Sequence, residues 1–140
     1  MADPLLAPLS VAASGLRAQS ERMLVAAQNI ANARSTGNAP GADPYRRKTI
    51  SFASELDRHS GLQTVQVAGR GEDPSPFRLE YRPGHPAADR NGYVKMPNVD
   101  LLIETADLRD ANRMYQANLQ VVRQAREIVT MTMDLLRTNG

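Results

Sequence analysis

Apolar residues near the start of the chain recur with the period of an α-helix. Between Pro8 and Ala33, the residues Leu9, Leu16, Met23 and Ile30 stand seven positions apart, which places them on one helical face. Pro8 is compatible with a helix because it falls in the first turn, where its missing amide proton would have no partner. The pattern predicts a first long helix with one large apolar stripe.

The last part of the chain shows the same period over a longer span. From Asn98, a residue type that suits an N-cap, one heptad position stays apolar to the end of the pattern. Its members are Leu101, Leu108, Tyr115, Val122, Val129 and Leu136, and Met114, Val121, Ile128 and Leu135 fill the neighbouring position. A helix of roughly 38 residues would be about 57 Å long, more than the diameter of a compact domain of this size.

The first helix is too short to cover the whole of that stripe. Apolar surface left along an extended helix indicates contact with other chains. The residues predicted to form the assembly interface are Leu9, Leu16, Met23, Ile30, Leu108, Tyr115, Val122, Val129 and Leu136.

The middle of the chain has the alternating pattern of half-exposed strands. Apolar residues occur at every second position in three places: Ile50 and Phe52, Val65 and Val67, and Phe77, Leu79 and Tyr81. Asn91-Gly92 is a strong hairpin signal, and the stretch from Arg34 to Asp43 has the composition of a mobile loop.

The predicted fold class is α+β, with two long terminal helices in an antiparallel, coiled-coil-like core and a small β-rich middle insert. The expected divisions are an N-terminal helix in residues 1–34, a β-rich insert with flexible loops in 35–97 and a C-terminal helix in 98–140.

Composition adds few candidates for chemistry. The formal charge of +2 is too small to indicate a nucleic-acid partner, and the absence of cysteine excludes disulfides and zinc-thiolate sites. His59 and His85 have no paired ligands nearby, so no catalytic residue, metal or cofactor is predicted. The cluster Arg46-Arg47-Lys48 favours a solvated strand face, with contact to nucleic acid or to peptidoglycan as the alternative.

The sequence predicts neither a cleavable signal peptide nor a membrane span. A signal peptide needs a basic start before an apolar run, whereas this chain has Asp3 and interrupts its apolar residues with Pro4 and Pro8. An uninterrupted apolar run of about 18 residues is also missing.

Several motifs resemble those of a known superfamily. Ser14-Gly15-Leu16 and Asn29-Ile30-Ala31-Asn32 are similar to the N-terminal signature of the axial proteins of the bacterial flagellum, and Tyr115-Gln116-Ala117-Asn118 is similar to their C-terminal signature. Asn91-Gly92-Tyr93-Val94 and Pro97-Asn98-Val99-Asp100 resemble the block that distinguishes one family of proximal rod proteins. Pro83-Gly84-His85-Pro86, Asp89 and Pro44-Tyr45-Arg46-Arg47 extend that match over nearly the whole chain.

The resemblance implies a structural subunit of the flagellar rod, the drive shaft that crosses the periplasm. In that family the two terminal helices form a core that lines the axial channel, and the β insert lies outside. The implied partners are other copies, the other proximal rod proteins, the distal rod, proteins of the membrane-ring junction and the type III export apparatus, which exports subunits without cleavage; no nucleic acid is implied. Another rod or hook subunit, or a basic binding module, is the alternative.

Overall fold

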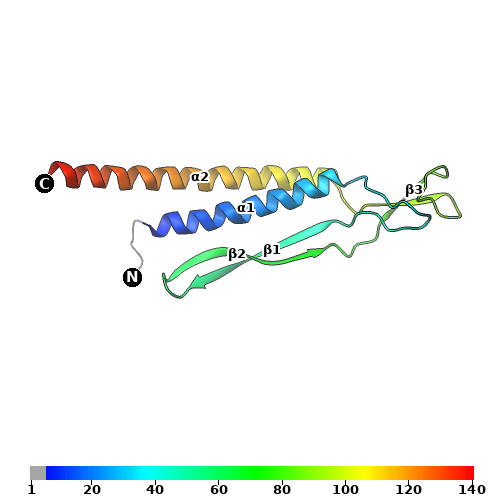
Figure 1. Ribbon diagram of the computed structural model, residues 1–140, viewed down its shortest axis with the longest axis horizontal. Coiled ribbons are helices and arrows are strands. Elements are labelled where there is room, and N and C mark those ends of the chain that lie inside the picture. Colours follow the sequence, from blue (N-terminus) through cyan, green and yellow to red (C-terminus); the bar gives the residue numbers. More distant parts are fainter. Residues whose placement is uncertain (1–5) are drawn as a thin grey trace. The chain divides into compact units, whose positions relative to one another are not determined.

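The computed structural model describes residues 6–140 and consists of two helices separated by four strands (Figure 1). Helix α1 spans Ala7–Ala31 and helix α2 spans Leu101–Thr138. Strand β1 (Lys48–Asp57) pairs with β2 (Leu62–Glu72), and β3 (Arg78–Tyr81) pairs with β4 (Tyr93–Met96). This arrangement confirms the predicted α+β fold class. Asp3 and Pro4, on which the signal-peptide argument drew, lie outside the described residues.

Helix α2 begins later than the sequence pattern predicts. Asp100, not Asn98, is its N-cap: the Asp100 Oδ1 accepts hydrogen bonds from the backbone nitrogens of Leu102 at 2.9 Å and Ile103 at 3.4 Å. Such a cap satisfies amide groups that have no partner within the helix. The prediction that Asn98 caps this helix is therefore wrong, because its side chain is used elsewhere. Neither helix of the described chain has the length and apolar content needed to cross a membrane.

The chain divides into two compact units. The first contains the described residues up to Arg22 together with Ser51–Ala68 and Asp110–Gly140. Its helical segments run antiparallel, as three contacts show: Gly15 lies against Asn118, the Gln19 Nε2 lies 3.6 Å from the Met114 Sδ, and Arg22 pairs with Asp110 at 3.1 Å. Residue numbers therefore rise along α1 while the numbers of the contacting residues fall along α2.

The second unit contains Met23–Ile50 and Gly69–Arg109. Strands β3 and β4 are antiparallel in it, and Glu80 stands opposite Val94. The side chains of Val94 and Met96 on β4 are buried with Ala87 from the connecting loop, and Ala88 packs against them. This small cluster forms the apolar centre of the unit because β3 itself is exposed on all its residues.

The signal Asn91-Gly92 occupies the end of the long β3–β4 loop and does not form a two-residue hairpin turn. Asp89 organises this corner: its Oδ1 accepts from the backbone nitrogens of Asn91 at 2.8 Å and Tyr93 at 3.0 Å. Gly92 has a φ of +86°, which favours glycine. A Cβ at Gly92 would also lie 2.8 Å from the Tyr81 ring.

Candidate assembly interface

The residues predicted to form the apolar stripes are only partly covered in the single chain. Leu9, Leu16, Met23 and Ile30 are half-buried on α1, and Leu108, Tyr115, Val122 and Val129 are half-buried on α2. Leu136 is 68% exposed. Part of the apolar surface on these two stripes therefore stays in contact with water when the chain is alone.

The side chains buried deepest on the helices are small or polar. On α1 they are Ala12, Ser14, Ala18, Ala26 and Asn29, and on α2 they are Glu104, Ala111 and Ala125. The α2 residues share one heptad position with Asn118, since each follows the previous one by seven. We call the line of these buried residues, along which the two helices meet, the seam. Small residues in the seam let two helices approach closely, and the larger apolar side chains remain at its flanks.

Gly15 marks a close approach of α1 to α2 in the first unit. A Cβ at this position would lie 2.8 Å from the Nδ2 of Asn118, and the next two nearest atoms also belong to the Asn118 side chain. Ser14 connects the same helix to β2, because its Oγ donates to the Val11 carbonyl at 2.7 Å and accepts from the Val65 backbone nitrogen at 3.2 Å. The geometry explains three motif residues, Ser14, Gly15 and Asn118.

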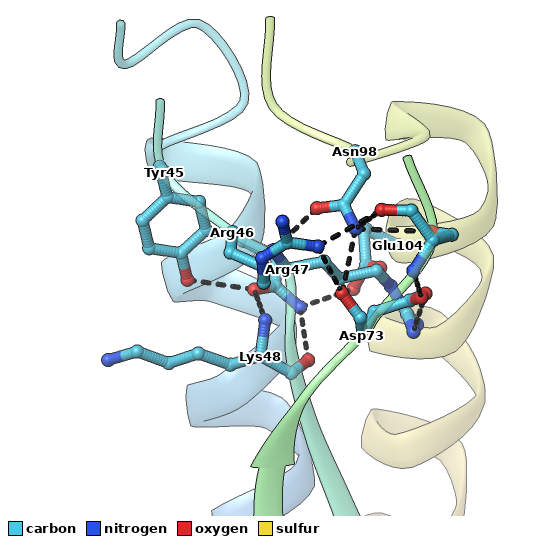
Figure 2. A network of polar contacts seen from close by, with 9 residues as sticks. Tyr45, Arg46, Arg47, Lys48, Asp73, Asn98 and Glu104 are labelled. Atoms are coloured by element: carbon cyan, nitrogen blue, oxygen red, sulfur yellow. Dashed lines mark hydrogen bonds and ion pairs between the residues drawn. The ribbon is translucent and has the colours of Figure 1, made fainter. Parts of the chain in front are cut away.

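Asn29 is the centre of a polar network in the second unit, and Figure 2 labels three of its partners, Tyr45, Lys48 and Glu104. Its side chain is fully buried. The Oδ1 accepts from the Tyr45 hydroxyl at 2.8 Å and from the Lys48 backbone nitrogen at 2.9 Å. The Nδ2 donates to the Lys48 carbonyl at 3.0 Å and to the Glu104 carboxylate at 3.1 Å. One amide therefore pairs with β1 as a neighbouring strand would, and also ties α1 to α2.

Glu104 brings a negative charge into this network with only 1% of its surface exposed. Its second carboxylate oxygen accepts from the Arg47 Nε (Figure 2). The Arg47 guanidinium also lies 3.6 Å from the Asp73 carboxylate. A buried charge is tolerated when it is paired and hydrogen-bonded, and here both oxygens of Glu104 have donors.

Asn98 completes the network from the segment before α2. Its Oδ1 accepts from the Arg47 backbone nitrogen at 2.8 Å, and its Nδ2 donates to the carbonyl oxygens of Asp73 at 3.0 Å and Ser75 at 3.1 Å (Figure 2). These bonds hold the start of β1 and the end of β2 together. Asn98 therefore connects these segments and does not cap α2 as predicted.

The environment of the network shifts three pKa values. Burial, followed by the charges of Glu104 and Glu72, raises the pKa of the Tyr45 hydroxyl, which keeps it protonated as a donor. Burial acts to lower the pKa of Arg47, but the hydrogen bond and charge of Glu104 outweigh it and the pKa rises. Hydrogen bonds from the Ser75 backbone and side chain, with the nearby Arg47, lower the pKa of Asp73.

The basic cluster is not the solvated strand face that the sequence favours. The Arg46 Nη1 donates to the carbonyls of Asp73 at 2.9 Å and Ser75 at 3.0 Å, and its guanidinium lies 4.1 Å from the centre of the Phe77 ring. Arg47 is paired with Glu104, and the Lys48 Nζ donates to Gln28 at 3.3 Å. The two arginines are thus engaged within the chain, which weakens the alternative of a basic binding surface.

The remaining motif residues and histidines have local contacts. Asn32 bonds the Gln28 carbonyl at the end of α1, whereas Gln116 is exposed on α2. His59 is fully exposed, and the His85 Nδ1 accepts from the Ala87 nitrogen at 3.0 Å. In the described part of the chain, no three His, Cys, Asp or Glu residues are grouped so that they could hold a metal ion.

The seam residues Ala111 and Ala125 and the charged pair of Arg47 with Glu104 were absent from the sequence-based interface. The spacing of Glu104, Ala111, Asn118 and Ala125 by seven was the signal that could have revealed the seam. It was obscured because alanine, asparagine and glutamate do not form an apolar stripe.

Long paired helices that expose apolar stripes beside a small β insert define a class of axial assembly proteins, and comparison with known proteins identifies the family. The model of the flagellar basal body rod FlgEFG protein C-terminal region matches residues 90–135. Flagellar basal-body rod protein FlgC of Agrobacterium fabrum is 59% identical over 137 residues, covering 98% of this chain and 99% of the relative. FlgC of Salmonella typhimurium is 44% identical over 133 residues, which cover 94% of this chain and 97% of that protein.

FlgC of Borreliella burgdorferi is 36% identical over 150 aligned positions, which cover 95% of this chain and 98% of that protein. The chain belongs to the FlgC family of flagellar basal-body rod proteins. It is a structural protein of the rod of the flagellar basal body. The resemblance that the motifs indicate is confirmed.

Proposed function

We propose that this rod subunit assembles helically by packing its terminal helices against those of neighbouring subunits, and that the packed helices transmit torque. The observation that carries the proposal is the apolar stripe on α2 that the single chain leaves uncovered. Met114, Val121, Ile128 and Leu135 are each 43% exposed or more, and they follow one another by seven residues. Proteins that remain monomeric rarely expose a continuous apolar stripe of this kind to water.

The size of the uncovered stripe suits a strong lateral contact. Complete burial of one large aliphatic side chain contributes about 1.5–3 kcal/mol. The four residues of the stripe are about half exposed, so covering them would contribute several kcal/mol for each contact, before the cost of association. The half-buried residues Leu108, Tyr115, Val122 and Val129 adjoin this stripe and complete the proposed interface.

The shape of α2 supports the transmission of torque. It is a continuous helix of 38 residues, about 57 Å long, without an internal proline or glycine. Packed helices of this kind resist twisting because neighbouring side chains would have to leave their contacts together. The role is mechanical, and we propose that the chain is not an enzyme and uses no cofactor.

The proposed partners follow from membership of the family. They are other copies of the chain, the other proximal rod proteins and the distal rod, with membrane-ring junction proteins at the base. We further propose that the subunit is located in the proximal part of the rod, within the periplasm, and reaches it through the type III export apparatus without cleavage of a signal peptide.

The proposal is tested by placing charges on the half-buried part of α2. The double substitution Val122→Asp and Val129→Asp should stop rod growth, because assembly would bury two unpaired carboxylates. Gln120→Asp and Gln124→Asp add the same charge at exposed positions of the same helix and should leave assembly intact. Electron microscopy of basal bodies and a motility assay measure the result.

Fully motile cells carrying the Val122→Asp and Val129→Asp chain would contradict the proposed interface. An intact rod in cells that lack the protein would contradict its role as a rod subunit. Export should be measured in parallel, since a variant that never leaves the cytoplasm says nothing about assembly.

A further inference from the structure

The second unit contains a groove of about 650 Å³ next to the first residue of α2. We call it the α2 groove. Its floor includes the buried residues Met96 and Val99, and Leu101 stands at its side with 43% of its surface exposed. A cavity of this size with an apolar floor is large enough to receive several side chains.

The rim of the α2 groove carries positive charge without an internal partner. Arg34 and Arg78 line it, both are exposed, and neither guanidinium has a hydrogen bond or ion pair with any residue that the structure describes. A third rim arginine, Arg82, is already paired with Glu80 at 2.9 Å. The groove therefore suits an occupant with apolar side chains flanked by two acidic ones.

The last third of α2 carries a surface of this chemistry. Ile128, Met131 and Leu135 follow one another at intervals of three and four residues and are 54%, 62% and 64% exposed. Glu127 and Asp134, seven residues apart, lie beside them on the helix, and their carboxylates form no hydrogen bond or ion pair with the described residues. We call these five residues the α2 strip.

The charges on this part of α2 are sorted by side. At about 100° per residue, Ile128 and Arg126 lie on opposite sides of Glu127. Arg123 and Arg137 lie on the same flank as Arg126, so the basic residues are gathered away from the apolar members of the strip. The apolar residues therefore lie on one side and the basic residues on the other, and Glu127 and Asp134 stand between them, with Arg123 four residues before Glu127 and Arg137 three residues after Asp134.

We propose that the α2 strip of a second copy of the chain docks in the α2 groove, with Glu127 and Asp134 paired to Arg34 and Arg78. The occupant is another copy because the groove and the strip belong to opposite ends of one 38-residue helix. The contact is heterologous, since each copy offers a groove to one neighbour and a strip to another. Such contacts build open polymers with a direction when they do not close into a ring.

The inference rests on the proposed helical assembly and assigns the last part of its exposed stripe, because Ile128 and Leu135 belong both to that stripe and to the α2 strip. The residues left to the lateral contact are Met114 and Val121 of the stripe and the half-buried Val122 and Val129 beside them. The lateral contact would hold neighbours side by side, and the docked strip would connect successive copies along the assembly.

Disulfide crosslinking in isolated basal bodies tests the contact, and the natural chain has no cysteine. Cells would produce two single-cysteine chains together, one with Leu101→Cys in the groove and one with Leu135→Cys in the strip. The matched control replaces Leu135→Cys by Met133→Cys, which is similarly exposed at 60% but turned to the other side of the helix. Non-reducing electrophoresis then measures the yield of the mixed dimer.

We expect a yield about tenfold higher for the Leu135→Cys pair than for the Met133→Cys pair, equivalent to about 1.4 kcal/mol. Adding Arg34→Glu and Arg78→Glu to the groove chain should lower the yield by a similar factor. Adding Glu127→Arg and Asp134→Arg to the strip chain should then restore it, because the two charge patterns are exchanged.

Three outcomes would overturn the docking proposal: equal yields for the two pairs, no mixed dimer in basal bodies that have complete rods, or a crosslink from Leu101→Cys to a different rod protein. None of them would affect the lateral interface, since complete rods would still be present. Loss of rods in the Val122→Asp and Val129→Asp variant tests that interface separately.

Discussion

Replacement of Glu104 should reveal how much the buried network contributes to the stability of the folded chain. Its carboxylate is 1% exposed and accepts hydrogen bonds from the Arg47 Nε and the Asn29 Nδ2. Glu104→Ala removes both acceptors and leaves Arg47 with the Asp73 carboxylate at 3.6 Å. Glu104→Gln keeps the shape of the side chain, removes its charge and replaces one of its two acceptor oxygens with an amide donor.

The two variants differ in expected magnitude for a physical reason. Breaking a buried ion pair by removing one partner costs about 3–5 kcal/mol. The Arg47 side chain is 24% exposed, so water can solvate part of the freed guanidinium, and we expect about 3 kcal/mol for Glu104→Ala. Hydrogen bonds to charged groups contribute about 1.5–3 kcal/mol against about 1 for neutral ones, so Glu104→Gln, which keeps one of the two acceptors, should cost about 2 kcal/mol.

Urea unfolding of the purified chain at pH 7, followed by far-ultraviolet circular dichroism, measures these differences. Glu127→Ala is the matched control, because it removes the same side chain from an exposed position on α2 and should change stability by less than about 0.5 kcal/mol. A double-mutant cycle with Arg47→Gln should give a coupling energy of about 1–3 kcal/mol. Equal stability of the wild-type and Glu104→Ala chains would refute the reasoning.

Three further predictions follow from contacts of single residues. Asn29→Ala should destabilise the chain by about 2–4 kcal/mol, because it leaves several buried polar groups without a partner; an unchanged urea midpoint would contradict this. Gly15→Val should cost about 1–3 kcal/mol through overpacking against Asn118, and Asn118→Ala in the same chain should recover part of that loss, so failure of the second change to help would locate the clash elsewhere. The folded pKa of Asp73 lies below its ordinary value, so its stabilising contribution is present above pH of about 4 and is lost as the pH falls through the folded pKa. In acid titrations followed by circular dichroism, Asp73→Asn should therefore lose less stability than the wild type between pH of about 5 and 2, and identical profiles would exclude this role.

The exact start of α2 depended on contacts that local sequence does not reveal. Asn98 and Asp100 are both residue types that cap helices, and they stand two positions apart. Asn98 is engaged with Arg47, Asp73 and Ser75, which are distant in sequence. Only the folded chain shows which of the two side chains was free to cap the helix.

Long-range contacts also explain why the sequence did not predict the environment of Arg46, Arg47 and Lys48. Local sequence shows three cations in a row, and such a run is most often solvated. Its two arginines acquire their partners from the segment that follows β2 and from α2. The pairing of Arg47 with Glu104 joins residues separated by 57 positions, and no short-range pattern predicts it.

The spacing of apolar residues by itself determined the two terminal helices, because a repeat of seven matches two turns of an α-helix. Alternation by two determined the strands of the insert in the same way. The choice of the inner helical face was decided only by the tertiary structure. Close approach at Gly15 and Asn118 requires small side chains in the seam, so alanines are buried there and the larger apolar residues stay at the flanks. Hydrophobicity along the chain shows which residues avoid water, whereas steric fit between distant segments selects which of them a single chain can cover.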